Sequence, residues 1–125
     1  MPDPAKMEAT VHEYVAAFAA HDAARVAALY AEDAVVEDPI GTPRYEGIAA
    51  IRAFYDGSIA TGATLELTGP VRVAHDCAAF AFSVHLEWQG AKQRIDVIDT
   101  FRFNEENKVV EMRAYWGPAN MHALG

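Results

Sequence analysis

Two long stretches of alternating apolar and polar residues constrain the fold of this chain more than any other feature. Every second residue is apolar from 78 to 88, where the pattern ends at Trp88, and the same period recurs with one exception from 95 to 103. A period of two is typical of a strand with one face toward a core. Gln89-Gly90 lies between the two stretches and is typical of a tight turn. The pattern predicts a long antiparallel hairpin with one apolar face.

The exception is Asp99, which falls on the face shared by Ile95, Val97, Phe101 and Phe103. An ionised carboxyl group among apolar side chains is costly, so we expect it to be protonated, paired with a cation or bound to a metal. No lysine or arginine shares this face of the strand. Asp99 is therefore a candidate neutral acid, able to donate a hydrogen bond into an apolar cavity.

The first half of the chain carries apolar residues at helical spacing. Helices first and strands afterwards indicate an α+β fold. Residues 34–38 are expected to form a short strand that stops at Pro39, which cannot donate to a ladder, so Asp38 lies at a strand end beside a loop. The three expected helices cover about residues 7–18, 26–30 and 47–58.

Further strands are expected at 64–68, 71–74 and 109–116. In the last of these, alternation places four residues on one face: Val110, Met112, Ala114 and Trp116. A curved, mostly antiparallel sheet with the three N-terminal helices over its apolar face forms a cone. The open mouth of such a cone encloses a pocket for an apolar ligand.

Composition narrows the possible partners. The 125 residues are 52% apolar, which is enough for one domain, 1–125, with a core. The net charge of −8 disfavours nucleic acid and anionic membranes, and no apolar run predicts membrane insertion. The five histidines lack metal-site spacing, and the single cysteine, Cys77, excludes an intramolecular disulfide. With no secretory signal in view, we expect a cytoplasmic protein that binds a small uncharged ligand.

Four polar residues have two interpretations each. Tyr14, Tyr30 and Tyr55 lie on the apolar stripes of three different expected helices. Each alone is most simply a core tyrosine, whereas together with Asp99 they can form a hydrogen-bond network aimed at one ligand oxygen. Asp38 is either a turn residue before proline or a general base whose pKa is raised by apolar neighbours.

The sequence also resembles a known family, the bacterial Δ5-3-ketosteroid isomerases of the nuclear-transport-factor-2-like superfamily. The resemblance runs from the first helix through Trp116. Five sequence segments carry the resemblance; taken together they are specific for the family, whereas any one of them alone is weak evidence. They are LYAEDAVVEDP at 29–39, AFY at 53–55, LTGPVR at 67–72, DVID at 96–99 and AYW at 114–116.

This resemblance implies an isomerase that moves a proton within a 3-oxo-Δ5-steroid through a dienolate, without a cofactor. It implies that Asp38 is the general base and that Tyr14 and protonated Asp99 form the oxyanion hole. Tyr30 and Tyr55 would support Tyr14. The side chains expected to contact the steroid are Trp116, Phe54, Phe82, Phe101 and Met112.

Two other classes of function remain open, because one fold hosts many chemistries. One is another enzyme on the same fold, such as a dehydratase, a cyclase or an epoxide hydrolase, although an epoxide hydrolase should hold an arginine between acids and no arginine here falls convincingly on an apolar face. The other is a non-catalytic binding or dimerisation module.

A homodimer is expected. The outer face of the sheet has some apolar character, and the resemblance implies pairing through that side. The residues that contribute are Val35, Ala79, Ala81 and Ile98.

Overall fold

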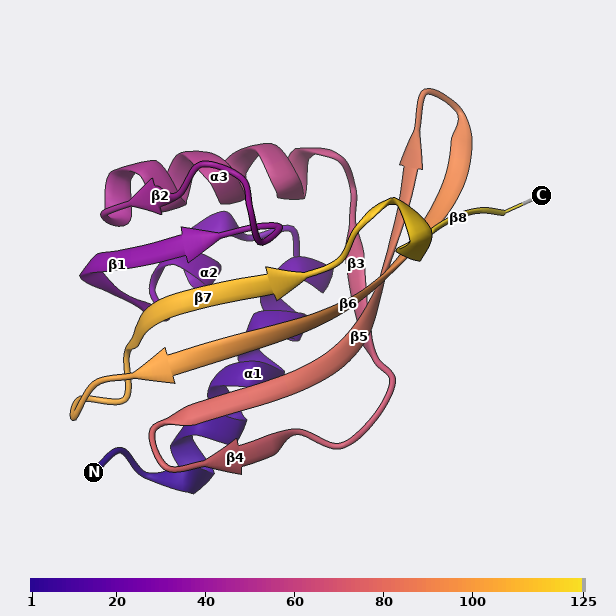
Figure 1. The fold of residues 1–125 in the computed structure, drawn as a ribbon. Coiled ribbons are helices and arrows are strands. Elements are labelled where there is room, and N and C mark those ends of the chain that lie inside the picture. The colour runs from indigo at the N-terminus through magenta and orange to yellow at the C-terminus, as the bar shows by residue number, and fades with distance from the viewer. Residues whose placement is uncertain (125) are drawn as a thin grey trace.

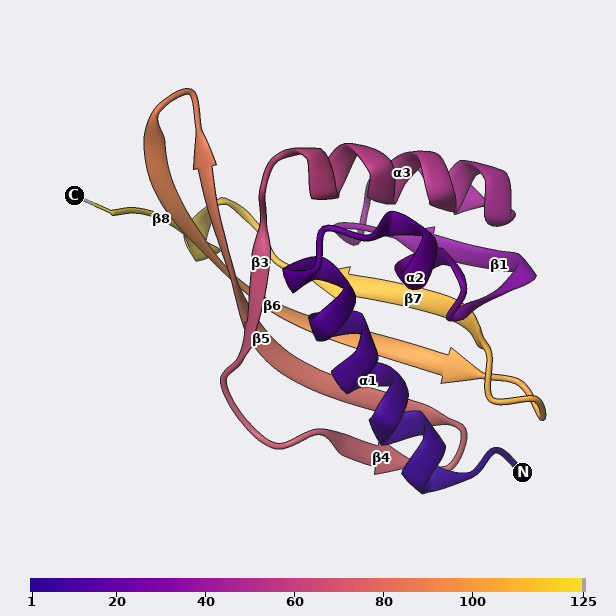
Figure 2. The same cartoon turned by 180° about the vertical axis from the view of Figure 1, so that it is seen from behind.

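The computed structural model describes residues 1–124, which form a curved sheet with α-helices against one of its faces (Figures 1 and 2). The helices are α1 (Pro4–Ala19), α2 (Ala23–Ala27), α3 (Ile48–Ala60) and a short 3-10 helix, η1 (Pro118–Asn120). The strands are β1 (Tyr30–Glu37), β2 (Tyr45–Glu46), β3 (Thr64–Leu67), β4 (Arg72–Ala74), β5 (Cys77–Trp88), β6 (Ala91–Phe103), β7 (Val109–Tyr115) and β8 (Met121–Ala123). The α+β arrangement expected from the sequence is confirmed.

The strand order is β2-β1-β7-β6-β5-β3, with β4 added to β5 and β8 added to β6. Every pair is antiparallel except β1 with β7. In that parallel pair, Glu37 at the end of β1 lies opposite Arg113 of β7. The residues that follow these two positions, Asp38 and Trp116 among them, therefore emerge at the same end of two adjacent strands.

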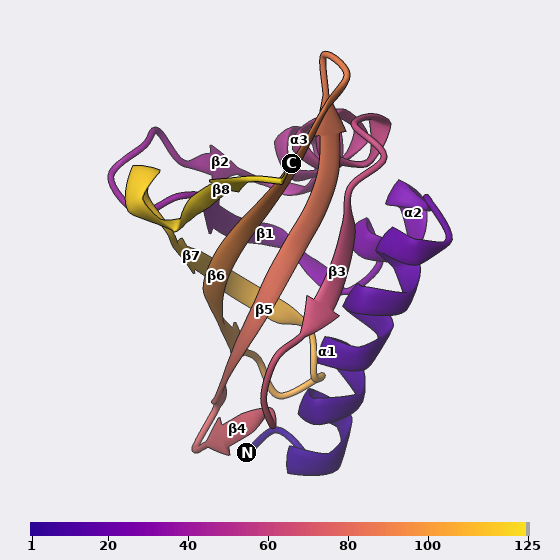
Figure 3. The ribbon, with the colours of Figure 1, turned by 90° about the vertical axis from the view of Figure 1, so that its right-hand side faces the viewer.

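Helix α1 begins where the sequence supplies both a cap and a proline. The Asp3 carboxylate accepts a hydrogen bond from the Ala5 backbone N–H at 2.9 Å, and Pro4 occupies the first turn. One stripe of the helix faces the sheet, and Figure 3 shows α1 running beside β3. The buried residues of the stripe are Met7, Val11, Tyr14, Ala17 and Phe18. Tyr14 is thus carried into the core by a rigid element.

Tyr30 is not helical, contrary to the expectation from its spacing. Helix α2 ends at Ala27, and Tyr30 is the first residue of β1, with 5% of its surface exposed. The chain turns toward the sheet because backbone pairing with β7 begins here: the Val109 N–H donates to the Leu29 carbonyl at 2.9 Å. Strand pairing overrides a weak local helical pattern at this position.

A β-bulge in β7 changes which residue at its start faces the core, so the expected inward position of Val110 was wrong. Arg102 pairs with Glu111 and Phe103 with Val109, so Val110 is an extra residue on its strand. As a result Val109 is fully buried, whereas Val110 is only partly so. Met112 and Ala114 keep the inward orientation that alternation predicts.

The β5–β6 hairpin extends past the helices, as its projecting tip in Figure 1 shows. Trp88 lies at this tip and is 52% exposed, so it does not belong to the core as its place in the alternation suggested. No helix within residues 1–124 is both long enough and apolar enough to cross a membrane.

Candidate active site

A cavity of about 240 Å³ lies between the helices and the inner face of β5 and β6. This volume is slightly below the usual range of small-molecule sites, about 300–1,000 Å³, so the cavity is sized for a single small ligand. Most of its wall is aromatic or aliphatic, and no lysine, arginine or histidine of residues 1–124 lines it. Apart from the indole of Trp116, the polar side chains on the wall are those of Tyr14, Asp38, Tyr55, Ser58, Thr61 and Asp99.

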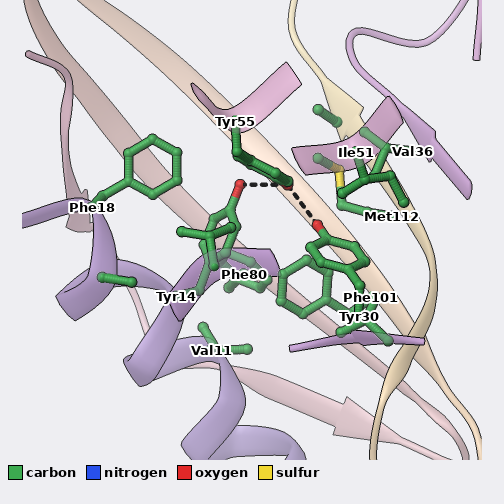
Figure 4. Close-up of a cluster of buried hydrophobic side chains, with 14 of the residues drawn as sticks. Val11, Tyr14, Phe18, Tyr30, Val36, Ile51, Tyr55, Phe80, Phe101 and Met112 are labelled. Carbon is green, nitrogen blue, oxygen red and sulfur yellow. Dashed lines mark hydrogen bonds between the residues drawn. The ribbon is translucent and has the colours of Figure 1, made fainter. Parts of the chain in front are cut away.

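Tyr14, Tyr30 and Tyr55 form a hydrogen-bonded chain, with Tyr55 in the middle (Figure 4). The Tyr14 and Tyr55 hydroxyl oxygens are 3.1 Å apart, and those of Tyr30 and Tyr55 are 2.5 Å apart. The three residues come from α1, β1 and α3, and none is more than 5% exposed. Burial raises the pKa of each hydroxyl well above its usual range, so all three are neutral donors at ordinary pH.

Each of the two bonds can be donated from either side, and counting hydrogens shows what one direction leaves for a ligand. Three hydroxyls carry three hydrogens, and two bonds use two of them, which leaves one. Tyr14 lines the cavity and Tyr30 does not. If Tyr30 donates to Tyr55 and Tyr55 donates to Tyr14, the remaining hydrogen belongs to Tyr14 and is available to a ligand.

Asp99 is 1% exposed and lines the cavity from the inner face of β6, as alternation predicted. Among residues 1–124, its Oδ1 atom is buried with no hydrogen-bond partner. Burial, reinforced by the nearby carboxylate of Asp38, raises the pKa of Asp99 well above its usual range. Both effects favour the protonated, neutral form of the carboxyl group, whose proton can be donated to a ligand. No group of three or more histidine, cysteine, aspartate or glutamate side chains that could hold a metal ion occurs within residues 1–124.

Asp38 lies one residue beyond β1 and is fixed by a bond that the sequence did not suggest. The indole N–H of Trp116 donates to Asp38 Oδ1 at 2.8 Å. Burial raises the pKa of Asp38, and the Trp116 hydrogen bond opposes that rise by favouring the anion. The result is a moderate elevation compared with the large one at Asp99. The cavity thus contains one carboxyl group suited to accept a proton and one suited to donate a hydrogen bond.

Comparisons with known proteins agree with this geometry. Residues 11–112 match the SnoaL-like domain family. The chain belongs to this family. It is 36% identical over 117 residues to a steroid Delta-isomerase from Nocardioides simplex, covering 94% of each chain. The chain also superimposes on the structure of SalBIII, an epoxide hydrolase/cyclase-like enzyme with a role in pyran ring formation in the polyether salinomycin. The TM-score is 0.93 and the sequence identity is 25%, and the match covers 99% of this chain and 100% of the other. The nuclear-transport-factor-2-like fold expected from the sequence is confirmed.

In this SnoaL-like chain, three of the five residues expected to contact a ligand line the cavity: Phe54, Phe82 and Trp116. The other two, Phe101 and Met112, are fully buried and do not reach its wall. Phe101 is packed edge-on against Tyr14, with ring centroids 5.3 Å apart, and Met112 lies opposite Phe101 on β7. Both residues pack against core side chains, and their contact with a ligand stays a prediction.

Several lining residues were not anticipated. The clearest are Ser58 and Thr61, which follow Phe54 at intervals of four and three residues along α3 and its C-cap. That spacing is a helical stripe, so the signal was present in the sequence once one member was assigned to the pocket.

Proposed function

We propose that this SnoaL-like protein is a steroid Δ-isomerase that converts 3-oxo-Δ5-steroids to 3-oxo-Δ4-steroids. The observation that carries the proposal is the convergence of Tyr14, Asp38 and Asp99 on one apolar cavity. The similarity to a steroid Delta-isomerase over 94% of the chain supports the same reaction. An apolar wall without cations suits a neutral polycyclic substrate.

Asp38 is the general base in this proposal. Removing a proton from carbon 4 of a 3-oxo-Δ5-steroid gives a dienolate, and this carbon acid is weak, so the base needs a pKa closer to that of its target. Burial of Asp38 raises its pKa in that direction. The Trp116 indole holds the carboxylate in place while leaving Oδ2 without a bond to this indole.

Tyr14 and Asp99 stabilise the dienolate oxygen. As carbon 4 loses its proton, electron density moves to the oxygen on carbon 3, and hydrogen bonds from two neutral donors strengthen with that charge. Tyr30 and Tyr55 act as positioning residues in this proposal: Tyr30 donates to Tyr55 and Tyr55 donates to Tyr14, so the Tyr14 hydrogen is free for the ligand.

The second half of the reaction returns the same proton. Protonated Asp38 delivers it to carbon 6, the 5,6 double bond moves to the 4,5 position, and the carbonyl on carbon 3 is restored. Atoms and charge balance without any further reactant, so the proposed cycle uses only side chains of the cavity. Asp38 ends as the anion with which it began.

An absorbance assay tests this proposal, because the conjugated Δ4 ketone absorbs ultraviolet light that the Δ5 ketone does not. We expect the purified protein to produce the absorbance of the conjugated enone from a 3-oxo-Δ5-steroid, and we expect Asp38→Asn to abolish most of the rate. A folded wild-type protein that gives no rate above the buffer, or no more than Asp38→Asn gives, contradicts the isomerase assignment.

A second candidate reaction is favoured by the similarity to SalBIII. A neutral Asp99 can protonate an epoxide oxygen while Asp38 removes a proton from an attacking hydroxyl group, which closes an oxygen ring. Turnover of a hydroxy-epoxide with no turnover of the steroid would favour this cyclase. Loss of the cyclisation in both Asp38→Asn and Asp99→Leu would be expected in that case.

We also propose a homodimer formed through the outer face of the sheet. Ile98 and Tyr115 lie on this face and are 50% and 44% exposed. They border a hollow whose lining includes Ala81 and Ser83 of β5. Sedimentation at micromolar concentration should give twice the mass of 13.6 kDa, and Ile98→Asp should lower it. A wild-type species of monomer mass would overturn the dimer.

A further inference from the structure

Two hydroxyl groups on the cavity wall have no part in the proposed chemistry, those of Ser58 and Thr61. Both residues line the cavity, and both are partly buried. Together with Phe54 they form one stripe along α3 and its C-cap. Ser58 lies one helical turn after Phe54, and Thr61 lies one turn after Ser58. Polar groups on an otherwise apolar wall fix which polar atoms a ligand can place against them.

The strand register locates these hydroxyls at the end of the cavity remote from Asp99. Asp99 and Ile95 are on the same face of β6, and four residues of strand span about 13 Å. Ile95 pairs with Val84, and Val84 pairs with Leu65 of β3. Since β3 starts three residues after Thr61, the Thr61 end of α3 adjoins the Ile95 end of the cavity.

The wall between the two ends is apolar. Val97 and Ile95 of β6 face the cavity there, with Phe82 and Val84 opposite them on β5. A ligand that extends from Asp99 to Thr61 therefore has a long apolar body, and its two ends meet polar groups. This arrangement suits a fused polycyclic skeleton with an oxygen at each end.

The hydrogen bonds at the remote end determine which kind of oxygen fits. Thr61 Oγ1 donates its hydrogen to the Ser58 carbonyl oxygen at 2.6 Å and accepts from the Ala63 N–H at 3.3 Å. A hydroxyl has two lone pairs, so Thr61 retains one position as an acceptor. Within residues 1–124 no hydrogen bond engages the Ser58 hydroxyl, which can therefore donate.

We propose that Ser58 and Thr61 form a polar subsite that selects substrates with a hydroxyl group at the end remote from the ketone. A ligand hydroxyl accepts from Ser58 and donates to Thr61, whereas a ketone in the same place can only accept from Ser58. The inference rests on the proposed function, which places the ketone of the substrate at Tyr14 and Asp99. It adds a chemical preference at the other end of the same cavity.

Three phenolic tetracyclic ligands test this subsite without turnover. The ligands are identical except at the remote ring carbon, which carries a hydroxyl, a ketone or only hydrogen. Fluorescence titration gives their dissociation constants with the wild-type protein, Ser58→Ala and Thr61→Val. Thr10→Ala is the matched control, because it removes a hydroxyl from α1 that bonds the Lys6 carbonyl and does not line the cavity.

We expect Ser58→Ala to weaken binding of the hydroxyl and ketone ligands by about 2- to 10-fold, the range of one neutral hydrogen bond, and to leave the third ligand unchanged. Thr61→Val should weaken the hydroxyl ligand alone by a similar factor. Thr10→Ala should change none of the three. Comparing each ligand between a variant and the wild-type protein cancels that ligand's own cost of leaving water.

Kinetics give a second readout. The subsite contacts a part of the substrate that does not react, so Ser58→Ala should raise KM for a hydroxylated 3-oxo-Δ5-steroid and leave kcat nearly unchanged. An equal effect of Ser58→Ala on all three phenols, or no effect on any, overturns the subsite. So does failure of all three to bind the wild-type protein.

These results are separable from the proposed function. If the phenols show the expected pattern but no 3-oxo-Δ5-steroid is isomerised, the subsite stands and the isomerase assignment fails. If a 3-oxo-Δ5-steroid is isomerised but Ser58→Ala affects the three phenols equally or not at all, the isomerase assignment stands and the subsite fails. Because Thr61→Val also removes a bond at the end of α3, Ser58→Ala decides the matter if Thr61→Val does not fold.

Discussion

Replacing Trp116 with phenylalanine should move the acidic limb of the pH–activity profile to higher pH. The indole N–H donates to Asp38 at 2.8 Å and lowers the pKa of this carboxyl group, against the larger upward effect of burial. Phenylalanine keeps an aromatic side chain on the wall and removes the donor. The anion of Asp38 is then less stable, so its pKa rises further.

The size of the shift follows from the type of bond. A hydrogen bond to a charged group contributes about 1.5–3 kcal/mol, and one pKa unit corresponds to about 1.4 kcal/mol, so the expected shift is about 1–2 units. In the proposed function Asp38 must be ionised to accept a proton, and activity is lost as pH falls through its pKa. Trp116→Phe should therefore lose activity at a higher pH than the wild-type protein does.

The profile of kcat/KM is the quantity to measure, because it reports the pKa of the free enzyme. Trp88→Phe is the matched control, since Trp88 is 52% exposed at the hairpin tip and away from Asp38. It should leave the limb where it is in the wild-type protein. If Trp116→Phe lowers activity by the same factor at every pH, with no movement of the limb, then Trp116 contributes packing and does not tune the base.

The alternating pattern predicted much of this fold because a period of two determines which face of a strand each side chain occupies. In β6 it placed Asp99 inward before any tertiary contact was known, and the pairing of β5 with β6 from Cys77↔Arg102 to Trp88↔Ala91 agrees with the expected hairpin. The helical stripe of α1 was equally clear. Local periodicity determines which face of an element is buried, and this is enough to place Tyr14, Tyr55 and Asp99 inside.

Features that depend on contacts between distant segments could not be predicted from the sequence. The bulge at Val110 and the strand conformation of Tyr30 both arise from pairing with distant segments. The Trp116 bond to Asp38 requires the parallel pairing of β1 with β7. Phe101 illustrates a further limit. A pattern of apolar residues indicates that a side chain is buried, but it does not distinguish a side chain that packs against core residues from one that lines an apolar cavity.

The remaining predictions concern the three polar groups of the proposed isomerase. Asp38→Asn should lower kcat by about 10⁴-fold or more, at or above the top of the usual range for base catalysis, because it removes the proton acceptor and keeps the shape. Circular dichroism should show that the fold is intact. Tyr14→Phe and Asp99→Leu should each lower kcat more than they change KM, because their hydrogen bonds strengthen with the charge of the transition state; a change in KM alone would make them binding groups only. A steroid with a phenolic ring in place of the dienolate should bind more tightly to Asp38→Asn than to the wild-type protein. The dienolate forms when Asp38 is protonated and neutral, and asparagine reproduces that neutral state, whereas the resting carboxylate faces an electron-rich ring. Adding Asp99→Leu should reverse much of the gain, since the phenolic oxygen then loses a donor. Fluorescence titration of the three proteins measures this directly, and equal affinities would mean that Asp38 and Asp99 do not act on a common ligand.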